Sequence, residues 1–219
     1  MTYPLIDRLI GDRRLRAVAT ERADGDVHPN RVASADLHAR QRAATGRTWT
    51  MLDQVHGTTV RHARAAGVGD VVVTTDDNAH IAVWAADCAP LILAADDGTL
   101  VAAHGGWRGL AAGVVGTAVQ AAHANGGIIV AALLGPVIGP CCYEFGADEL
   151  AMIPDAVRAE TSTGESALDV NATIAAMLRH HDVELDVAGP CTGCDDRWFS
   201  HRVRSEPGRH AVVAWWETP

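Results

Sequence analysis

Three residues with metal-binding side chains stand at corners of the chain, each beside a run of apolar residues. His56 lies in the segment QVHG, Cys88 in ADCAP and His104 in AAHGGWRG. Corners at strand ends are where a rigid scaffold can direct polar side chains into one site. Imidazole and thiolate suit Zn²⁺, and three protein ligands with an open position are typical of catalytic zinc. The alternative for each residue is an independent polar or core side chain, since single histidines and buried cysteines are common.

Two glycines and an arginine that follow His104 indicate an anion-binding corner. Gly105 and Gly106 allow close approach to the backbone, and free N–H groups at the start of a helix favour an anion. Arg108 would lie in the first turn of that helix, where a cation opposes the helix dipole. A bound phosphate would explain Arg108, and the alternative is a surface ion pair with Asp87.

The other four cysteines form two short motifs, Cys141-Cys142 and Cys191-x-x-Cys194. Four thiolates could form a second metal site. Adjacent cysteines, however, cannot easily both point at one ion, so the sequence favours small buried thiols that pack the loops. A redox role for the CxxC motif lacks the βαβ context of thioredoxin-like proteins.

Two of the three candidate ligands flank a predicted β-hairpin. Two apolar runs are separated by an Asp-Asp-Gly turn signal, with the turn centre expected at residues 97–98. This centre places Leu91 opposite His104, and Cys88 three residues beyond that pair, about 10 Å along an ideal strand. A shared site therefore requires the chain to turn inward at Pro90, which cannot donate to a strand ladder.

Other elements follow from apolar periodicity and from turn residues. Strands are expected at residues 17–20, 49–55, 58–60, 69–75, 78–85, 91–95, 100–103, 128–134, 183–187 and 211–216. Helices are expected at residues 30–45, 107–123, 147–163 and 168–181, with an ordered loop at 135–146. Strands and helices without strict βαβ alternation predict an α+β fold.

Composition narrows the class of protein. A chain of 219 residues favours one domain over residues 1–219. The net charge of -9 argues against nonspecific binding to nucleic acid or to an anionic membrane. No secretory leader or membrane-spanning run is evident, and five cysteines are an odd number. We therefore expect reduced thiols and a cytoplasmic location, with the protein a monomer or weak homodimer.

Five motifs in one order resemble those of the YfiH/laccase-domain family. They are QVHG, ADC-x-P, AH-x-GWRG, GP-x-IGPCCYE and CTGC…FSHR…GR, within residues 54–209. The family includes the bacterial peptidoglycan editing factor and purine nucleoside phosphorylases formerly labelled polyphenol oxidases. The resemblance implies an α/β/β/α sandwich with mixed sheets and a zinc ion on His56, Cys88 and His104. It also implies phosphorolysis of adenosine, inosine, guanosine and methylthioadenosine, together with deamination of adenosine.

On this interpretation Cys88, Asp87 and Arg108 are the catalytic candidates. The expected substrate-binding residues are Gln54, Gly105, Gly106, Cys141, Glu144, Arg202 and Arg209. The departing purine needs a proton, and the sequence leaves Asp87, Glu144 and Cys141 open as its donor. Arg202 and Arg209 are the weaker candidates for contacts with phosphate or ribose.

Three other functions remain open from the sequence. Copper-dependent polyphenol oxidation is one, because a cysteine with two histidines also suits blue copper. The usual multicopper oxidases carry His-x-His pairs, however, and this chain has none. A cysteine hydrolase with Cys88 as nucleophile and His104 as base, acting in peptidoglycan-precursor editing, is the second. A non-enzymatic zinc module is the third, although no fourth clustered ligand accompanies the other three.

Overall fold

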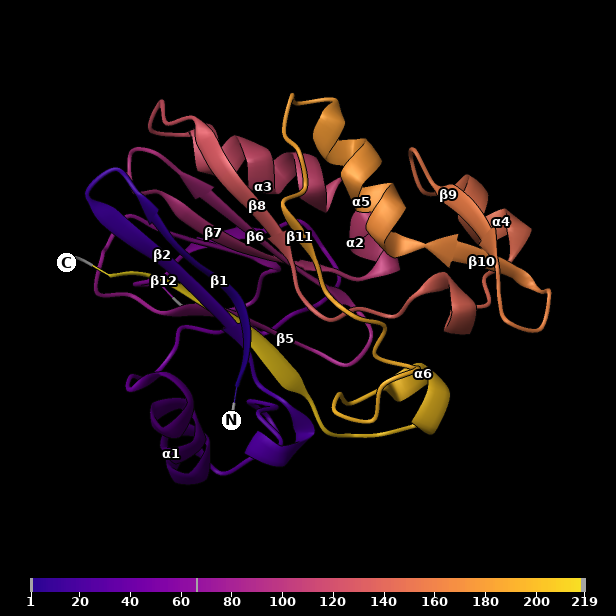
Figure 1. The fold of residues 1–219 in the computed structure, drawn as a ribbon, viewed down its shortest axis with the longest axis horizontal. Coiled ribbons are helices and arrows are strands. Elements are labelled where there is room, and N and C mark those ends of the chain that lie inside the picture. The colour runs from indigo at the N-terminus through magenta and orange to yellow at the C-terminus, as the bar shows by residue number, and fades with distance from the viewer. Residues whose placement is uncertain (1, 66, 218–219) are drawn as a thin grey trace.

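Four layers make up the fold in the computed structural model, which describes residues 2–65 and 67–217. Helix α1 (Ser34–Thr45) covers the outer face of a four-stranded sheet. A six-stranded sheet packs on the inner face, and helices α3 (Val114–His123) and α5 (Val170–Arg179) cover its other side (Figure 1). The arrangement confirms the predicted α+β class and the α/β/β/α sandwich.

The six-stranded sheet carries most of the candidate site and is mixed, with the order β11-β8-β6-β7-β4-β3. Its strands are β3 (Val60–His62), β4 (Val71–Thr74), β6 (Ala89–Ala95), β7 (Leu100–Gly105), β8 (Ile129–Leu134) and β11 (Val187–Ala188). Strands β4, β6 and β7 are buried along their whole length. Burial on both faces explains why they are continuous apolar runs rather than alternating patterns.

The four-stranded sheet is antiparallel, with the order β1-β2-β12-β5. Its strands are β1 (Tyr3–Ile10), β2 (Arg13–Ala19), β5 (Ile81–Ala85) and β12 (His210–Glu217). A separate pair, β9 (Val157–Glu160) and β10 (Ser166–Asp169), lies beside the two main sheets (Figure 1). Pairing of β12 with β5 returns the C-terminal part of the chain to the middle of the fold.

Apolar side chains fill the three spaces between the layers. Successive residues of β6 face opposite sides, so Ile92 packs between the sheets while Leu91 and Leu93 pack against the helices. Leu37 of α1 and Val213 of β12 belong to the third core, on the outer face of the four-stranded sheet. Since both faces of each sheet are covered, the strands that flank the candidate ligands are held firmly.

Several predicted elements differ from those observed. The helix expected at 107–123 is broken by Gly113, whose φ of 89° ends α2 (Trp107–Ala111) before α3 begins. The helix expected at 147–163 is limited to α4 (Ala147–Ala151), because the chain then turns into β9. Residues 49–55 form isolated bridges instead of a strand, and β1 was not predicted. The remaining short helices are η1 (Arg22–Asp24), η2 (Pro140–Cys142) and α6 (His201–Arg204).

The central hairpin forms between β6 and β7, as predicted, but its register is shifted by one residue. Pro90 lies opposite His104, where Leu91 was expected. The cause is the turn: the N–H of Gly98 donates to the carbonyl of Ala95, and Gly98 itself has φ of 90°. This is a turn followed by a glycine bulge, which adds one residue to the loop. Pro90 is inside β6, so the strand does not end there.

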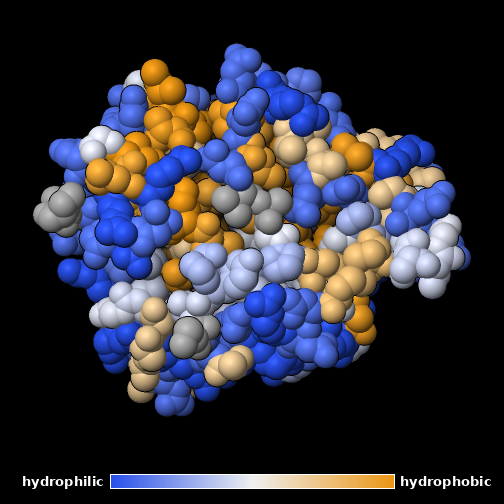
Figure 2. Space-filling view, viewed as in Figure 1, coloured by the Kyte–Doolittle hydropathy of each residue, from blue (hydrophilic) through white to orange (hydrophobic). Residues whose placement is uncertain are grey.

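Hydrophilic and hydrophobic residues are both present on the face drawn in Figure 2. Figure 2 shows hydrophilic residues around most of this face and hydrophobic ones at its upper left, in the region of β1 and β8. Among the described residues, Leu9 and Ile128 are the most exposed large hydrophobic side chains, at 64% and 65%. Among the helices of residues 2–65 and 67–217, none has the length and apolar character needed to cross a membrane.

Candidate metal centre

The structure brings His56, Cys88 and His104 together. Each offers one ligand atom, and these atoms lie within 4.8 Å of one another. The Cys88 Sγ atom is 3.7 Å from His56 Nε2, and the two imidazole rings meet edge to face with centroids 4.8 Å apart. Strand β7 supplies His104, Cys88 directly precedes β6, and His56 comes from the loop before β3. The pairing of β6 with β7 thus places two of the three side chains.

The chain turns toward the site at Asp87, not at Pro90 as the sequence predicted. Asp87 has φ of 92°, in the left-handed region that few non-glycine residues adopt. Its buried carboxylate accepts hydrogen bonds from the Thr192 hydroxyl and from the Arg202 backbone N–H, both at 2.6 Å. These bonds stabilise the turn, which presents Cys88 to the two histidines.

Asp70, directly before β4, holds both histidines in place. Its carboxylate accepts a hydrogen bond from His104 Nδ1 at 2.9 Å. It also accepts from the backbone N–H groups of Val55, His56 and Gly57, the last two at 2.9 and 2.8 Å. With Nδ1 engaged, His104 has Nε2 left as its ligand atom. Histidines that bind a metal commonly donate their other ring N–H to a carboxylate in this way.

The sequence analysis missed Asp70. An acidic residue after Gly69 resembles an ordinary turn residue, and its partners lie up to 34 residues away. The available signal was its place directly before Val71-Val72-Val73, where a buried strand starts. A carboxylate that enters a buried strand needs several donors, because an unpaired buried charge is costly. Asp70 is 1% exposed.

The ionisation of the site favours a thiolate next to an imidazolium. Burial alone would raise the pKa of the Cys88 thiol, but the His104 and His56 imidazoles outweigh it and lower that pKa to about 6. Burial lowers the pKa of His104, whereas the Cys88 charge and the Asp70 carboxylate raise it to about 9. Burial likewise raises the pKa of Asp70, but hydrogen bonds from His104 and the Gly57 N–H bring it below its usual range. Metal binding at this site would release the imidazolium proton.

The three side chains fit a zinc-sized ion. Zn–N and Zn–S bonds of about 2.1 and 2.3 Å at a tetrahedral angle give an N···S separation of about 3.6 Å. The observed separation between His56 Nε2 and Cys88 Sγ is 3.7 Å. Gly106 makes this possible, because a Cβ atom there would lie 2.1 Å from the His56 ring. Gly105 likewise lies close to Ala89. A Cβ atom added at Gly105 would lie 3.1 Å from the Ala89 Cβ.

Arg108 is exposed and does not pair with Asp87, the alternative that the sequence left open. Its guanidinium lies over the Trp107 ring at 4.4 Å from the centroid, and no ion pair or hydrogen bond holds it within the described ranges. Arg202 is also exposed, and its guanidinium lies 5.1 Å from the centroid of the Tyr143 ring. Arg202 also hydrogen-bonds to the Tyr143 side chain, and its other guanidinium N–H groups stay available for an anion, as do those of Arg108.

One cavity is lined by Cys88, and a second cavity shares Trp107 with it as a wall. The smaller, of about 30 Å³, is lined by Asp87, Cys88, Gly105, Gly106 and Tyr143 among others. The larger, of about 270 Å³, is lined by Glu144, Phe145, Gly146, Glu149 and Arg202 in addition to Trp107. The small cavity suits a water-sized group, and the larger one approaches the size of a small-molecule site.

The other predicted substrate-binding residues lie elsewhere or have partners. The Gln54 amide bonds to both backbone groups of Trp84, at 2.8 and 3.1 Å. Arg209 donates to the carbonyls of residues 206–208, which fastens its own loop. Cys141 lies with Cys142, Cys191 and Cys194 in a separate cluster. Among the sequence candidates, the structure therefore groups Asp87, Gly105 and Gly106 around the three ligands.

Tyr143 was not among the predicted site residues, although it stands in the motif GPCCYE. It lines the small cavity together with Cys88. Burial raises the pKa of the Tyr143 phenol to about 12, and the nearby Cys88 charge acts in the same direction. Its hydroxyl therefore stays protonated at neutral pH and can donate a hydrogen bond.

Comparison with known proteins gives consistent matches over the whole fold. Residues 17–217 match the family model described as multi-copper polyphenol oxidoreductase laccase. A purine nucleoside phosphorylase of Mycobacterium tuberculosis is 33% identical, and the match covers 93% of each chain. One of Pseudomonas aeruginosa is 31% identical over 92% of this chain and 93% of the relative.

Solved structures show the same architecture at lower identity. A Neisseria meningitidis protein has a TM-score of 0.81 at 24% identity, over 98% of both chains. YlmD from Geobacillus stearothermophilus has the same TM-score and identity, over 97% of this chain and 99% of its own. At this identity the likeness shows the fold alone.

Proposed function

This chain belongs to the laccase-domain family, and we propose that it is a zinc-dependent purine nucleoside phosphorylase. Its expected substrates are adenosine, inosine, guanosine and methylthioadenosine. The names of its relatives support the reaction class. The observation that carries the proposal is the convergence of His56, Cys88 and His104 at a cavity lined by Cys88 and Trp107, with Arg202 in the wall of the cavity that shares Trp107.

The proposed ligands of the metal are His56, Cys88 and His104. Zinc bound there would supply a Lewis acid, which can polarise an oxygen atom or lower the pKa of water toward about 7. Asp70 keeps the His104 ring in one orientation through Nδ1 and fixes the loop that carries His56. Copper fits the same donor set. We favour zinc because the chain lacks the His-x-His pairs of the usual multicopper oxidases.

The cations beside the cavities suit the phosphate co-substrate. Phosphorolysis joins a phosphate oxygen to the anomeric carbon of ribose, while the bond from that carbon to the purine nitrogen breaks. The bond's electron pair leaves with the purine, which takes up a proton. Arg202 and Arg108 have free guanidinium donors that can hold the phosphate and orient it. We assign to the neutral Tyr143 hydroxyl the role of donating a hydrogen bond to the departing purine.

Asp87 has a different role in this proposal. Its carboxylate accepts two hydrogen bonds of 2.6 Å, from Thr192 and from Arg202 N–H, so it acts by positioning Cys88. Glu144 is exposed at the wall of the larger cavity, where it can contact the nucleoside. Of the proton donors that the sequence left open, we do not propose Asp87, because its carboxylate already accepts two hydrogen bonds, or Cys141, because it lies in the separate cysteine cluster.

Deamination of adenosine is proposed for the same site. The small cavity beside Cys88 has a volume of about 30 Å³, more than the about 10–15 Å³ that one water molecule needs. Water that attacks the amino-bearing carbon of the purine would form a bond to that carbon, and the amino group would leave as ammonia. Phosphate is not needed, so this activity would persist in phosphate-free buffer.

A cysteine hydrolase is the second candidate, and one observation favours it. Cys88, His104 and Asp70 form a thiolate, an imidazolium and a carboxylate in contact, which is the arrangement of an activated cysteine nucleophile. Peptidoglycan precursors would be its substrates. The metal-dependent proposal differs because it needs His56 as a ligand.

The deciding experiment measures metal content and nucleoside turnover together. We expect free base and ribose 1-phosphate from adenosine and inosine, only with phosphate present, and loss of about one metal equivalent together with turnover in His56→Ala. His62→Ala is the matched control, since His62 is an exposed histidine in β3. Nucleoside turnover that survives complete removal of metal would refute the metal-dependent proposal. Hydrolysis of a peptidoglycan precursor by the metal-free protein, abolished by iodoacetamide at Cys88, would instead support the hydrolase.

A further inference from the structure

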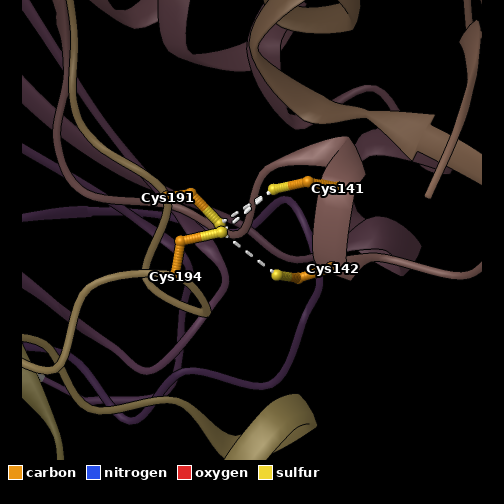
Figure 3. A group of neighbouring side chains, drawn as sticks. All are labelled: Cys141, Cys142, Cys191 and Cys194. Carbon is orange, nitrogen blue, oxygen red and sulfur yellow. Dashed lines mark hydrogen bonds between the residues drawn. The ribbon is translucent and has the colours of Figure 1, made fainter. Parts of the chain in front are cut away.

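The four remaining cysteines form a second cluster that the laccase-domain site does not use. Cys141 and Cys142 lie in η2, and Cys191 and Cys194 lie in the loop after β11. Each offers a sulfur atom, and the four atoms lie within 4.8 Å of one another. Figure 3 shows the η2 side chains pointing toward the pair from the later loop. The sequence favoured small buried thiols that pack the loops, whereas the structure brings all four sulfur atoms together near the surface.

The short helix explains why adjacent cysteines converge. Pro140 starts η2, and the tight 3₁₀ turn places both following side chains on the side that faces the 191–194 loop (Figure 3). Cys194 is exposed and the other three are half-buried, so the cluster lies near the surface. An ion could therefore enter without unfolding of the core.

The sulfur separations match a tetrahedral metal site. Cys141 Sγ lies 3.2 Å from Cys194 Sγ and 3.6 Å from Cys191 Sγ, and Cys142 Sγ lies 3.4 Å from Cys194 Sγ. A disulfide would need about 2.0 Å between sulfur atoms. Four thiolates about 2.3 Å from one zinc ion lie about 3.8 Å apart along each edge of the tetrahedron. Small outward movements would therefore complete the coordination.

Two glycines make room for the cluster. A Cβ atom on Gly139 would lie 3.3 Å from Cys191 Sγ and 3.5 Å from Cys141 Sγ. A Cβ atom on Gly193 would lie 2.8 Å from the Cβ and 2.9 Å from the Sγ of Cys142. Neither glycine has a positive φ, so space rather than turn geometry explains them. The N–H of Gly139 also donates to Cys191 Sγ at 3.1 Å, the kind of bond that stabilises a bound thiolate.

We propose that Cys141, Cys142, Cys191 and Cys194 bind one zinc ion in a closed tetrathiolate site. Four protein ligands fill a tetrahedral coordination shell, which is the pattern of structural rather than catalytic zinc. Thiolate ligands select zinc over magnesium or calcium, which prefer oxygen. The site is separate from His56, Cys88 and His104 and does not depend on the proposed nucleoside chemistry.

The ion would fasten the loop of residues 191–194 to η2. Within that loop Thr192 donates to the Asp87 carboxylate at 2.6 Å. Arg204 donates to the carbonyls of Thr192 and Gly193, at 3.0 and 3.1 Å. A zinc clamp at this place therefore stabilises the segment that supports the turn before Cys88.

The experiment counts metal per chain in the full-length protein. We expect about two zinc equivalents in the wild type and about one in Cys191→Ser/Cys194→Ser. The matched control is His56→Ala/Cys88→Ser, which removes a thiol from the other cluster and should also hold about one equivalent. One equivalent in the wild type that Cys191→Ser/Cys194→Ser retains in full would overturn the proposal.

Cobalt(II) provides a measurement that needs no cysteine change in the cluster. In the His56→Ala/Cys88→Ser background the only thiols are the four in question. Added cobalt(II) should give the intense sulfur-to-metal charge-transfer bands of a tetrathiolate, and zinc should abolish them. The chelator 1,10-phenanthroline should lower the melting temperature of this variant. Absence of the bands, or disulfides between these cysteines in protein kept under reductant, would refute the site.

Discussion

Replacing Asp70 by Asn removes one negative charge and one acceptor oxygen from beneath the candidate metal centre. In the wild type both oxygens accept from N–H groups, Oδ1 from His56 and His104 and Oδ2 from Gly57. In asparagine an –NH₂ group replaces one of the two oxygens. In either position this donor group faces the N–H donors that the oxygen accepted from. At least one charge-assisted hydrogen bond is therefore lost, and the other acceptor loses its charge.

The expected cost follows from these contacts. A hydrogen bond to a charged group contributes about 1.5–3 kcal/mol, so the free energy of unfolding should fall by about 2–5 kcal/mol. For a chain of this length that is a melting temperature lower by very roughly 4–20 °C. The His104 ring also loses the partner that fixes its orientation. Loss of such a partner typically lowers metal affinity by about 10–100-fold.

Two measurements separate these effects. Urea unfolding of the metal-free protein gives the stability change, and competition with a chelator at a temperature where both proteins are folded gives the zinc affinity. Asp53→Asn is the matched control. Asp53 lies three residues before His56, its carboxylate is exposed, and it contacts neither histidine. If Asp70→Asn is folded and binds zinc as tightly as the wild type, Asp70 does not position the ligands.

Two further predictions concern phosphate and acid stability. Arg108→Ala and Arg202→Ala should each lower kcat/KM for phosphate by about tenfold to a hundredfold, because a charge-assisted pair is lost. Deamination of adenosine in phosphate-free buffer should fall much less. Equal losses in both reactions would contradict the phosphate role. For Glu206, hydrogen bonding to Arg22 lowers the pKa to about 2 from 4.5. A lowered pKa adds stability that is fully present above about pH 4.5 and is lost as the pH falls toward 2, at most about 3 kcal/mol before solvent screening. Glu206→Gln should therefore weaken the fold at pH 7 and flatten this part of the urea-derived stability curve; an unchanged curve would disprove the effect.

The three candidate ligands could be named from the sequence as residues at strand ends, but only the family resemblance joined them into one set. His56, Cys88 and His104 each stand beside a glycine or proline at the end of an apolar run. The hairpin that joins two of them has a strong turn signal, and only its glycine bulge shifted the register. Short-range patterns therefore identified the residues and the hairpin, whereas their convergence depends on the turn at Asp87 and on the contacts of Asp70.

What the sequence did not reveal depends on contacts between distant segments. In the sequence Asp70 resembles a turn residue. Its hydrogen bond to His104 becomes evident only in the fold, where β7 brings His104 next to it. The convergence of Cys141 and Cys142 on a loop about 50 residues later depends on the 3₁₀ turn and on glycine at position 193. Gly113 broke a helix whose apolar pattern continues through it, because periodicity does not report a positive φ.

Asp87 connects the two sulfur-containing clusters. Its backbone carbonyl accepts from the N–H of Ile138 at 3.0 Å, one residue before Gly139 and the η2 turn. Its carboxylate accepts from Thr192, in the loop that carries the other two cysteines. Both segments that would hold the tetrathiolate ion therefore also hold the residue directly before Cys88. Because Asp87 has a positive φ and needs these bonds to keep it, an ion bound by the four cysteines would stabilise the position of the Cys88 thiolate without touching it.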